Sequence, residues 1–448
     1  MKKIYLFITM CLITFSMQAQ NIEEIMTNAE KGDAKSQTTL GYNYYTGKNG
    51  VEKDYKQAVY WWTKAADQGY ARAQYNLGTC YTNGKGVEKD YNQAVYWYTK
   101  AADQGYASAQ YDLGLCYVYG DGVARDIDKT LFWWKKAADQ DNVDAQLDLG
   151  NLYWGGEGVE KDYKQSVYWW TKAANQNSPR AQFNLGVCYV NGIGVAQDNK
   201  QAVYWWTKAA EQGHADAQYY TGACYDEGTG VEKNEIQAVY WWTKAANQGH
   251  LDAQYHLGLS YTAGDGVVQD YKQAVDWFTK AANQGHASAQ NSLGVRYHKG
   301  EGVPQNDEQA VYWWKKAAAQ GEAMAQNNLG KSYKDGVGVK QDYKEAFSWY
   351  SKAADQGHAE AEKMLGVFYY NGMGVEKDYK KAFDWFTKAV KQGDVEAMYN
   401  LAVCYYEGDG VAQDSKQALY WAREANRRMS ELSEENQQLL KQLLKELE

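Results

Sequence analysis

The sequence predicts an all-α fold, a solenoid of about eleven 36-residue helix–turn–helix repeats. Three observations predict it: an unbroken 36-residue period, helical spacing of apolar residues within each period, and an almost complete lack of proline. The 448 residues include only 2 Pro but 42 Gly. Glycines that recur without proline are typical of helices joined by regular turns, and they exclude collagen and low-complexity disorder.

The period is marked by valine and tryptophan residues that recur at steps of 36. The valines are Val51, Val87, Val123, Val159, Val195, Val231, Val267, Val303, Val339, Val375 and Val411. The tryptophans, called here the fixed Trp, are Trp61, Trp97, Trp133, Trp169, Trp205, Trp241, Trp277, Trp313, Trp349, Trp385 and Trp421. A period of this length indicates stacked repeats, because one helix pair cannot bury its own apolar face.

Residues 71–106 form one repeat, and the first half of this repeat has the pattern of a helix. Ala73, Leu77 and Tyr81 recur at i, i+4 and i+8, which places them on one face of a helix. Gly78 leaves room for a second helix to approach closely. The glycines of residues 84–87 then predict a turn, because glycine adopts positive φ at little cost.

The second half of the same repeat begins with a helix-capping pattern. Asp90 is followed three residues later by Gln93, which predicts a capping box in which Asp accepts from an early amide and Gln reaches back to the cap. Trp97 and Tyr98 then lie on the apolar stripe of the second helix. The helix is expected to end at residues 104–105, a Gln-Gly pair.

These residues resemble a known repeat family. The pattern A-x-x-x-L-G-x-x-Y-x-x-G-x-G-V-x-x-D-x-x-x-A-x-x-W-x-x-K-A-A-x-Q-G is similar to the Sel-1-like repeat, a relative of the tetratricopeptide repeat, over residues 33–429. The resemblance implies a right-handed superhelix whose first helices line the concave side. It also implies a scaffold that binds other proteins and is not an enzyme, with no catalytic residues to transfer.

The two ends of the chain depart from the pattern. Lys2 and Lys3 precede a short apolar run that ends in small residues, so residues 1–19 are expected to be an export signal cleaved after Ala19. The leucines of residues 430–448 form one helical stripe. The expected organisation is a signal peptide at 1–19, an N-terminal capping helix at 20–32, eleven repeats at 33–429 and a C-terminal capping helix at 430–448. A dimerising coiled coil is the alternative for the last segment.

The charge and hydropathy of the chain limit the classes of partner and the cellular locations that are expected. The chain has 47 Lys+Arg against 56 Asp+Glu, a net charge of −9, which disfavours nucleic acid and anionic lipid as partners. No stretch beyond the signal is apolar enough to cross a membrane, so no transmembrane segment is expected in the mature chain. We therefore expect an exported protein that is periplasmic, envelope-associated or secreted.

Candidate catalytic and metal-binding residues are scarce. Five cysteines share one repeat position and are expected to be free thiols, because neighbouring copies lie too far apart for a disulfide: Cys80, Cys116, Cys188, Cys224 and Cys404. Some relatives pair two cysteines within each repeat and have been discussed as β-lactamases, but this chain lacks the second cysteine. Histidines on different repeats cannot converge on one ion. No catalytic residue, cofactor or metal is expected.

Two sets of aromatic residues are candidates for binding. The first-helix row is the position two residues before the conserved Leu; it holds Tyr75, Tyr111, Leu147, Phe183, Tyr219 and Tyr255, then Asn291, Asn327 and Lys363, and finally Tyr399. The second-helix row is the residue before the fixed Trp; it holds Tyr60, Tyr96, Phe132, Tyr168, Tyr204 and Tyr240, then Asp276, Tyr312, Ser348, Asp384 and Tyr420. Because both rows accept polar residues, both are expected to be solvent-accessible. The alternative is that these rings shield neighbouring repeats.

The function predicted from the sequence is an exported scaffold that holds a protein or peptide on its concave face. Its partner-binding residues are predicted in the first six or seven repeats: Tyr75, Tyr111, Phe183, Tyr219 and Tyr255. A carbohydrate-binding envelope protein that uses exposed aromatic rings is the alternative, since sugars stack on such rings. An enzyme, including a β-lactamase, ranks third.

Overall fold

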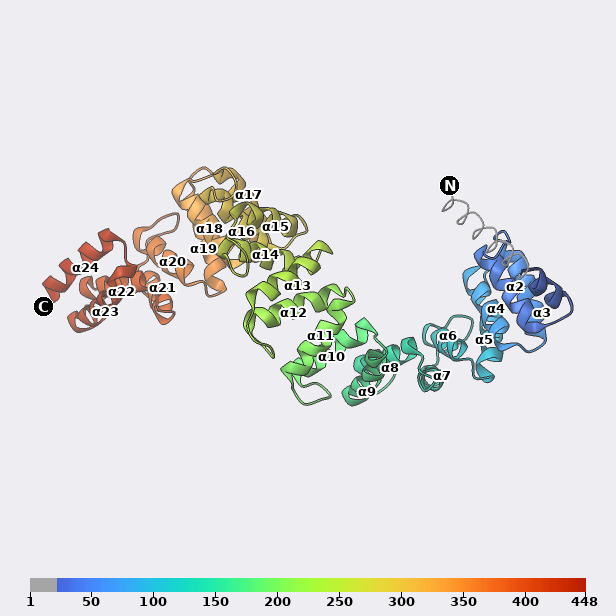
Figure 1. The fold of residues 1–448 in the computed structure, drawn as a ribbon. Helices are drawn as coiled ribbons and strands as arrows, with labels where there is room; N and C mark the ends of the chain where they lie inside the picture. Colours follow the sequence, from blue (N-terminus) through green and yellow to red (C-terminus); the bar gives the residue numbers. More distant parts are fainter. Residues whose placement is uncertain (1–21) are drawn as a thin grey trace, which may run out of the picture. The chain divides into compact units, whose positions relative to one another are not determined.

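The computed structural model describes residues 22–448, and these residues form helices and turns without a strand (Figure 1). The predicted all-α repeat fold is confirmed. The predicted export signal, residues 1–19, lies outside the described residues. Contacts divide the chain into two units. The first unit is residues 1–217 with 229–231, and the second unit is residues 218–228 with 232–448.

Each repeat of the first unit contributes two helices, almost all of 13 residues. The first helices of these repeats are α2 (Ala34–Thr46), α4 (Ala71–Asn83), α6 (Ala107–Tyr119), α8 (Val143–Gly155) and α10 (Pro179–Asn191). The second helices are α3 (Tyr55–Asp67), α5 (Tyr91–Asp103), α7 (Ile127–Ala138), α9 (Tyr163–Asn175) and α11 (Asn199–Glu211). The next helix, α12 (Ala215–Glu227), crosses the boundary between the units.

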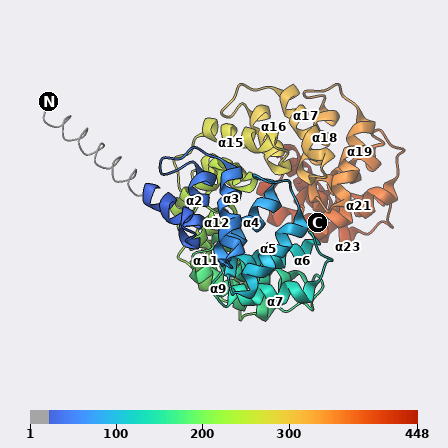
Figure 2. The same ribbon diagram turned by 90° about the vertical axis from the view of Figure 1, so that its right-hand side faces the viewer.

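The second unit repeats the same arrangement. Its first helices are α14 (Leu251–Ala263), α16 (Ala287–Lys299), α18 (Ala323–Asp335), α20 (Ala359–Asn371) and α22 (Val395–Glu407). Its second helices are α13 (Glu235–Asn247), α15 (Tyr271–Asn283), α17 (Asp307–Ala319), α19 (Tyr343–Asp355), α21 (Tyr379–Lys391) and α23 (Ser415–Arg427). A 3-10 turn (Met429–Glu431) and α24 (Glu434–Leu447) follow. Consecutive helices from α15 to α19 are direct neighbours (Figure 2).

The two helices of a repeat approach closely where a glycine of the first lies against a ring of the second. A Cβ added at Gly78 would lie 2.5 Å from the ring of Tyr98, and one added at Gly222 would lie 2.6 Å from Trp242. Where the ring is an indole, its N–H also reaches the first helix, as in the 3.2 Å bond from Trp242 Nε1 to the carbonyl of Tyr219. The close approach expected at Gly78 is confirmed.

The turn between the helices uses a main-chain bond that the capping-box pattern did not predict. The Asp90 carboxylate accepts from the amides of Asn92 and Gln93 at 2.8 and 3.1 Å, as expected. The Asp90 amide, however, donates to the carbonyl of Tyr81 at 3.0 Å, so the expected return bond from the Gln93 side chain is wrong. The turn carries the end of the first helix beside the start of the second, where a fixed carbonyl is the better-placed acceptor. The same bond recurs in all eleven repeats.

The fixed Trp residues form the seams between repeats. Seven are buried, and Trp61, Trp349, Trp385 and Trp421 are half-buried. Trp205 packs with Trp170 of the preceding repeat and with Leu185 of the first helix of its own repeat in one cluster of buried residues. The aromatic residue after the fixed Trp is buried in all ten repeats that have one. The predicted core role of both positions is confirmed.

A chain of buried glutamines joins successive repeats, and sequence reasoning missed it. Gln182 is fully buried; it donates to the carbonyl of Ala174 at 3.1 Å and accepts from Gln212 at 2.8 Å. The equivalent donor pairs are Gln68–Gln37, Gln104–Gln74, Gln140–Gln110, Gln176–Gln146, Gln248–Gln218, Gln284–Gln254, Gln320–Gln290, Gln356–Gln326 and Gln392–Glu362. The signal was available as a Gln or Glu beside the first alanine of nearly every repeat.

Apolar residues outside the repeats pack onto both ends of the array. Residues 22–30 form a helix in which Ile22 and Ala29 are buried with Leu40 of α2. At the other end, Leu440 and Leu443 of α24 are buried in a cluster that draws on α22 and α23. Each of these two helices therefore covers an apolar surface at an end of the array, where no further repeat follows to cover it.

We expect Trp205→Ala to lower the free energy of unfolding by roughly 3–5 kcal/mol, as other large-to-small core substitutions do. The loss should appear as faster amide exchange in α9 to α11, because repeat stability depends on nearest neighbours. Tyr204→Ala is the matched control. Tyr204 is 49% exposed, and its substitution should change stability by at most about 0.5 kcal/mol. Equal effects of the two substitutions would contradict the packing described for Trp205.

In the chain that lacks residues 1–19, thiol labelling should detect five reactive cysteines when the protein is denatured without reductant. The five described cysteines are buried and free, and burial raises the pKa of each thiol to about 12. Labelling of the folded protein should therefore be slow, since the thiolate is the reactive form. A count of three or one in denatured protein would reveal disulfides.

Candidate interaction surface

The first-helix row is less exposed than expected: Leu147, Asn291 and Lys363 are buried, and the other seven members are half-buried. The rings of the five predicted partner-binding residues, Tyr75, Tyr111, Phe183, Tyr219 and Tyr255, are all half-buried. Asn291 and Lys363, the polar members on which the expectation rested, are each only 6% exposed. The reasoning failed because polar side chains can be buried when they have partners. Asn291 accepts a 3.1 Å bond from Asn328 in the next first helix.

The ring faces of this row are stacked on rings that precede the next first helix. Phe183 stacks on His214 with centroids 4.8 Å apart and planes 15° apart. Tyr219 stacks on His250 and Tyr255 on His286 in the same way, at 4.7 and 4.8 Å. One face of each of these three rings, Phe183, Tyr219 and Tyr255, is therefore covered by a contact within the protein.

Two hydroxyl groups of the row lie beside the following first helix. Tyr111 Oη donates to the Asp148 carboxylate at 2.7 Å, and Tyr219 Oη lies 3.3 Å from His256 Nε2. Burial, the largest cause, raises the pKa of Tyr219 to about 12. The structure thus gives the row a packing role, in line with the alternative that the rings shield neighbouring repeats. Its role in partner binding stays a prediction.

Histidines at the start of first helices act as helix caps. The Nδ1 atoms of His250 and His286 accept from the third amide beyond each, at 3.3 and 3.1 Å. His214 caps α12 in the same way, with 3.4 Å from Nδ1 to the Ala217 amide. Burial lowers the pKa of His214, and Arg180 lowers it further, whereas Asp216 raises it. A protonated Nδ1 could not accept this bond.

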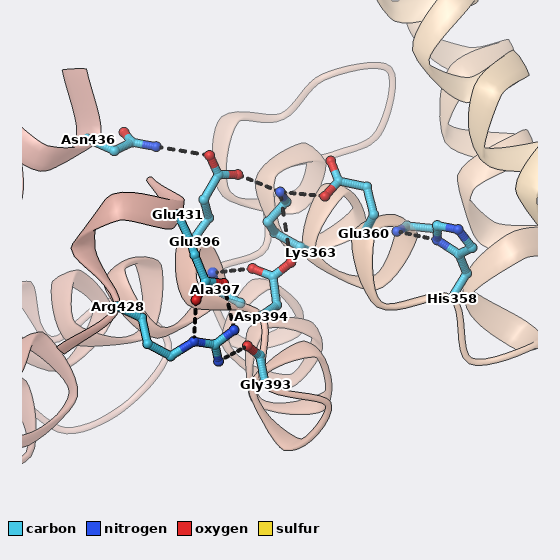
Figure 3. A network of polar contacts seen from close by, with 11 residues as sticks. His358, Glu360, Lys363, Gly393, Asp394, Glu396, Ala397, Arg428, Glu431 and Asn436 are labelled. Atoms are coloured by element: carbon cyan, nitrogen blue, oxygen red, sulfur yellow. Dashed lines mark hydrogen bonds and ion pairs between the residues drawn. The ribbon is translucent and has the colours of Figure 1, made fainter. Parts of the chain in front are cut away.

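Lys363 shows how a charge replaces a ring in the first-helix row (Figure 3). Its ammonium bonds to Glu360 at 2.6 Å and to Glu396 of the next first helix, with Asp394 at 3.9 Å. Burial acts to lower the pKa of Lys363, but the bonds to Glu360 and Glu396 outweigh burial, and the net pKa is raised. The lysine therefore joins α20 to α22 as a charged cross-link.

Arg428 extends this polar network toward the C-terminal end of the repeats. Its guanidinium donates to the Gly393 carbonyl at 2.7 Å and to the Glu431 carboxylate at 2.6 Å (Figure 3). The side chain of Asn436 donates to Glu396 at 3.4 Å. These bonds connect α24 and the turn before it to the acids around Lys363.

Three small pockets occupy the same repeat position between consecutive first helices. Their volumes are about 320, 260 and 260 Å³. They lie between α6 and α8, between α16 and α18, and between α20 and α22. The second aromatic of the intervening second helix lines each one: Trp134, Trp314 and Phe386. Residues at equivalent positions recur around them, as with Asp148, Asn328 and Asn400.

The rims of these pockets differ in chemistry. The pocket beside Trp134 has the acids Asp148 and Glu157. The pocket beside Trp314 has His298, Lys299 and Lys331 together with Asp335. The pocket beside Phe386 is lined by Tyr370, Asn371, Tyr399 and Asn400. One repeated shape thus presents three different sets of side chains.

The second-helix row is exposed, as expected. The eight aromatic residues of this row are between 47% and 51% exposed: Tyr60, Tyr96, Phe132, Tyr168, Tyr204, Tyr240, Tyr312 and Tyr420. Each ring meets the adjacent fixed Trp edge to face, with centroids 4.9–5.1 Å apart. This row is therefore the more open of the two aromatic sets.

Within residues 22–448, no three His, Cys, Asp or Glu side chains gather in a way that would hold a metal ion. None of the helices in that range combines the length and apolar character needed to cross a membrane.

Comparison with known proteins identifies the repeats. The model of the Sel1 repeat matches eleven consecutive segments: residues 34–70, 71–106, 107–142, 143–178, 179–214, 215–250, 251–286, 287–322, 323–358, 359–394 and 395–428. The chain belongs to the Sel1 repeat family. The resemblance drawn from the sequence pattern is confirmed. A search of curated proteins gives no match.

Solved structures of Sel1 repeat proteins agree with this assignment. A protective antigen of uropathogenic Escherichia coli with an SLR fold is 36% identical, with a TM-score of 0.87, over 95% of this chain and 94% of the antigen. A Sel1 repeat protein from Oxalobacter formigenes is 38% identical, with a TM-score of 0.53, over 71% of this chain and 93% of that protein.

We expect acid to destabilise this Sel1 repeat protein around His214. The folded-state pKa of His214 is lowered, so the unfolded chain binds the proton at higher pH. Stability should fall as the pH drops through about 6.5, the ordinary histidine value, toward the lower folded-state pKa. Amide exchange in α12 at pH 7.5 and pH 5.5 measures the loss.

His214→Asn is the matched variant for this prediction. Asn142 already caps α8 at the equivalent position, with a 2.8 Å bond to the Ala145 amide. The variant should keep the cap and lose part of the acid sensitivity of α12. The same acid-induced increase in exchange in both proteins would show that His214 is not the titrating group.

Proposed function

We propose that this protein is an exported, non-catalytic scaffold whose first-helix face binds an extended segment of a protein or peptide partner. The observation that carries the proposal is the pocket that recurs in register between consecutive first helices. The pockets, at about 260–320 Å³, lie at or below the lower end of the range of roughly 300–1,000 Å³ that small-molecule sites occupy.

The spacing and chemistry of the pockets favour a chain-like ligand. An extended peptide rises about 3.3 Å per residue, and neighbouring helices pack ~8–10 Å apart. A peptide that crosses the first helices of the second unit would thus bring side chains to the pockets beside Trp314 and Phe386, which lie two repeats apart. The acidic, basic and amide-rich rims would select different side chains. A non-catalytic role fits the Sel1 repeat family and the use of polar groups in caps and ladders.

Export rests on the expected signal at residues 1–19. The similar Sel1 repeat protein from uropathogenic E. coli is a protective antigen. Fractionation of cells that express the full chain, and a chain without residues 2–19, tests export. The full chain should leave the cytoplasm, and the shortened chain should remain there.

Photo-cross-linking tests the binding face. A photoreactive amino acid at Lys331, on the rim of the pocket beside Trp314, should capture a discrete partner in extracts of the native cell. The same amino acid at Lys344, at the start of the second helix α19, is the control. The partner, once identified, can be purified and its affinity measured directly.

Filling the pockets should then weaken that affinity. The variant Asn151→Trp, Lys331→Trp and Val403→Trp places a large side chain at the same position in all three pockets. We expect the dissociation constant to rise at least tenfold while circular dichroism and thermal unfolding stay close to wild type. A folded variant with unchanged affinity would exclude the first-helix pockets as the site.

A further inference from the structure

Tyr119 is an exposed ring at a position where the other first helices of the repeats have none. It is the last residue of α6, and it is 73% exposed. The other first helices end in a residue that is not aromatic, such as Asn83 in α4 and Gly155 in α8. The fold therefore does not require an aromatic residue here, and the exposed ring indicates a surface property of this repeat.

Tyr119 lines the pocket beside Trp134, which combines apolar walls with two carboxylates. Trp134 and Leu152 are buried in the lining, whereas Glu157 is exposed at the rim. Asp148 is half-buried in the same lining. None of the residues that line the pocket is a base. An aromatic ring beside two carboxylates is a combination that attracts a cation.

The carboxylate of Asp148 is bound by two neutral donors. It accepts from Tyr111 Oη at 2.7 Å and from Asn151 Nδ2 at 3.3 Å. Burial, the largest cause, raises the pKa of Asp148, whereas both bonds and the charge of Arg180 lower it. Arg180 and Lys161, which packs over Gly156, lie near the pocket but do not line it. A cation in the pocket would therefore gain a partly desolvated carboxylate as its partner.

The segment that forms this pocket is acidic when every charged side chain is counted, including the helix caps. Residues 107–162, from the start of α6 to the cap of α9, contain eleven acids and five bases. The acids are Asp112, Asp121, Asp126, Asp128, Asp139, Asp141, Asp144, Asp148, Glu157, Glu160 and Asp162, and the bases are Arg125, Lys129, Lys135, Lys136 and Lys161. The equivalent segment around the pocket beside Trp314, residues 287–342, contains six acids and seven bases. The two pockets share a position in the repeat but lie in segments of opposite net charge.

We propose that the pocket beside Trp134 binds the basic side chain of an arginine or lysine in the partner segment. The inference rests on the proposed peptide site and specifies what one part of that site recognises. The methylene stem would pack on Trp134 and Leu152. The cationic group would pair with Asp148 and Glu157 and lie against the ring of Tyr119. Arginine fits better than lysine, because its planar guanidinium can bond to carboxylates and stack on a ring at the same time.

Selection from a phage-displayed library of random short peptides tests the inference. The target is the immobilised chain without residues 1–19, and the peptides that bind it should be enriched in arginine and lysine. The variant Asp148→Asn with Glu157→Gln should lose this enrichment. The variant is expected to fold, which circular dichroism checks, because Asn occupies the position of Asp148 in other repeats, as Asn184 and Asn400.

A matched control separates this pocket from general attraction by an acidic protein. Glu52→Gln with Glu88→Gln removes the same charge from exposed positions in two turns of the same unit. This control should keep the enrichment in arginine and lysine. An equal loss of enrichment in the control and in the pocket variant would overturn the inference, as would selected peptides that are not enriched in basic residues.

A double-mutant cycle then locates the charge of the peptide. A selected peptide and its counterpart with citrulline, the neutral analogue of arginine, are compared by fluorescence anisotropy. Citrulline should weaken binding to the wild type at least tenfold and binding to the variant of Asp148 and Glu157 at most about twofold. Tyr119→Asn, which introduces the residue that ends α4, should weaken binding of the arginine peptide about two- to fivefold.

The outcomes distinguish this inference from the proposed function. Equal losses with citrulline in the wild type and in the pocket variant would overturn the inference and leave the first-helix peptide site standing. A library that yields no binding peptide would overturn the peptide site together with the inference.

Discussion

The close approach of two helices at a glycine is the constraint on which the rest of the structure depends. With a ring of the second helix pressed against Gly78 or its equivalents, the helix pair has one allowed spacing. That spacing places the carbonyl of Tyr81 beside the amide of Asp90 and so determines the turn. The fixed Trp of the same second helix packs against the preceding repeat, as Trp205 does against Trp170. One small residue per repeat thereby controls packing within a repeat and between repeats.

Buried polar groups give the stack its register. Apolar contacts alone would tolerate small shifts of one repeat against the next, because they have no direction. Gln182, bonded to Ala174 and Gln212, permits only one alignment, since any other leaves buried donors and acceptors unpaired. Lys363 has the same effect near the C-terminal end through Glu360 and Glu396. Both devices work because their partners recur at fixed positions in neighbouring repeats.

The two faces of the repeats have different physical character. The first-helix face carries pockets at three places, and the rims of these pockets differ in charge. The second-helix face of the first unit is uniform, with one ring and one lysine in each repeat. The two sets of helices therefore present surfaces of different chemistry.

The period of the sequence determined the number of repeats, the helix boundaries and the capping aspartates, because these depend on local spacing. It also determined the burial of the fixed Trp, because every repeat makes the same contacts around this residue. The tertiary structure decided which polar positions are buried. The sequence pattern alone places Asn291 and Lys363 on the surface. In the folded chain each is hydrogen-bonded to a residue 37 or 33 positions away. The tertiary structure also decided that the rings from Tyr75 to Tyr255 pack within the protein while those from Tyr60 to Tyr204 face solvent. Both rows contain aromatic and polar residues in the sequence, and only the packing of the neighbouring repeat determines which row is covered.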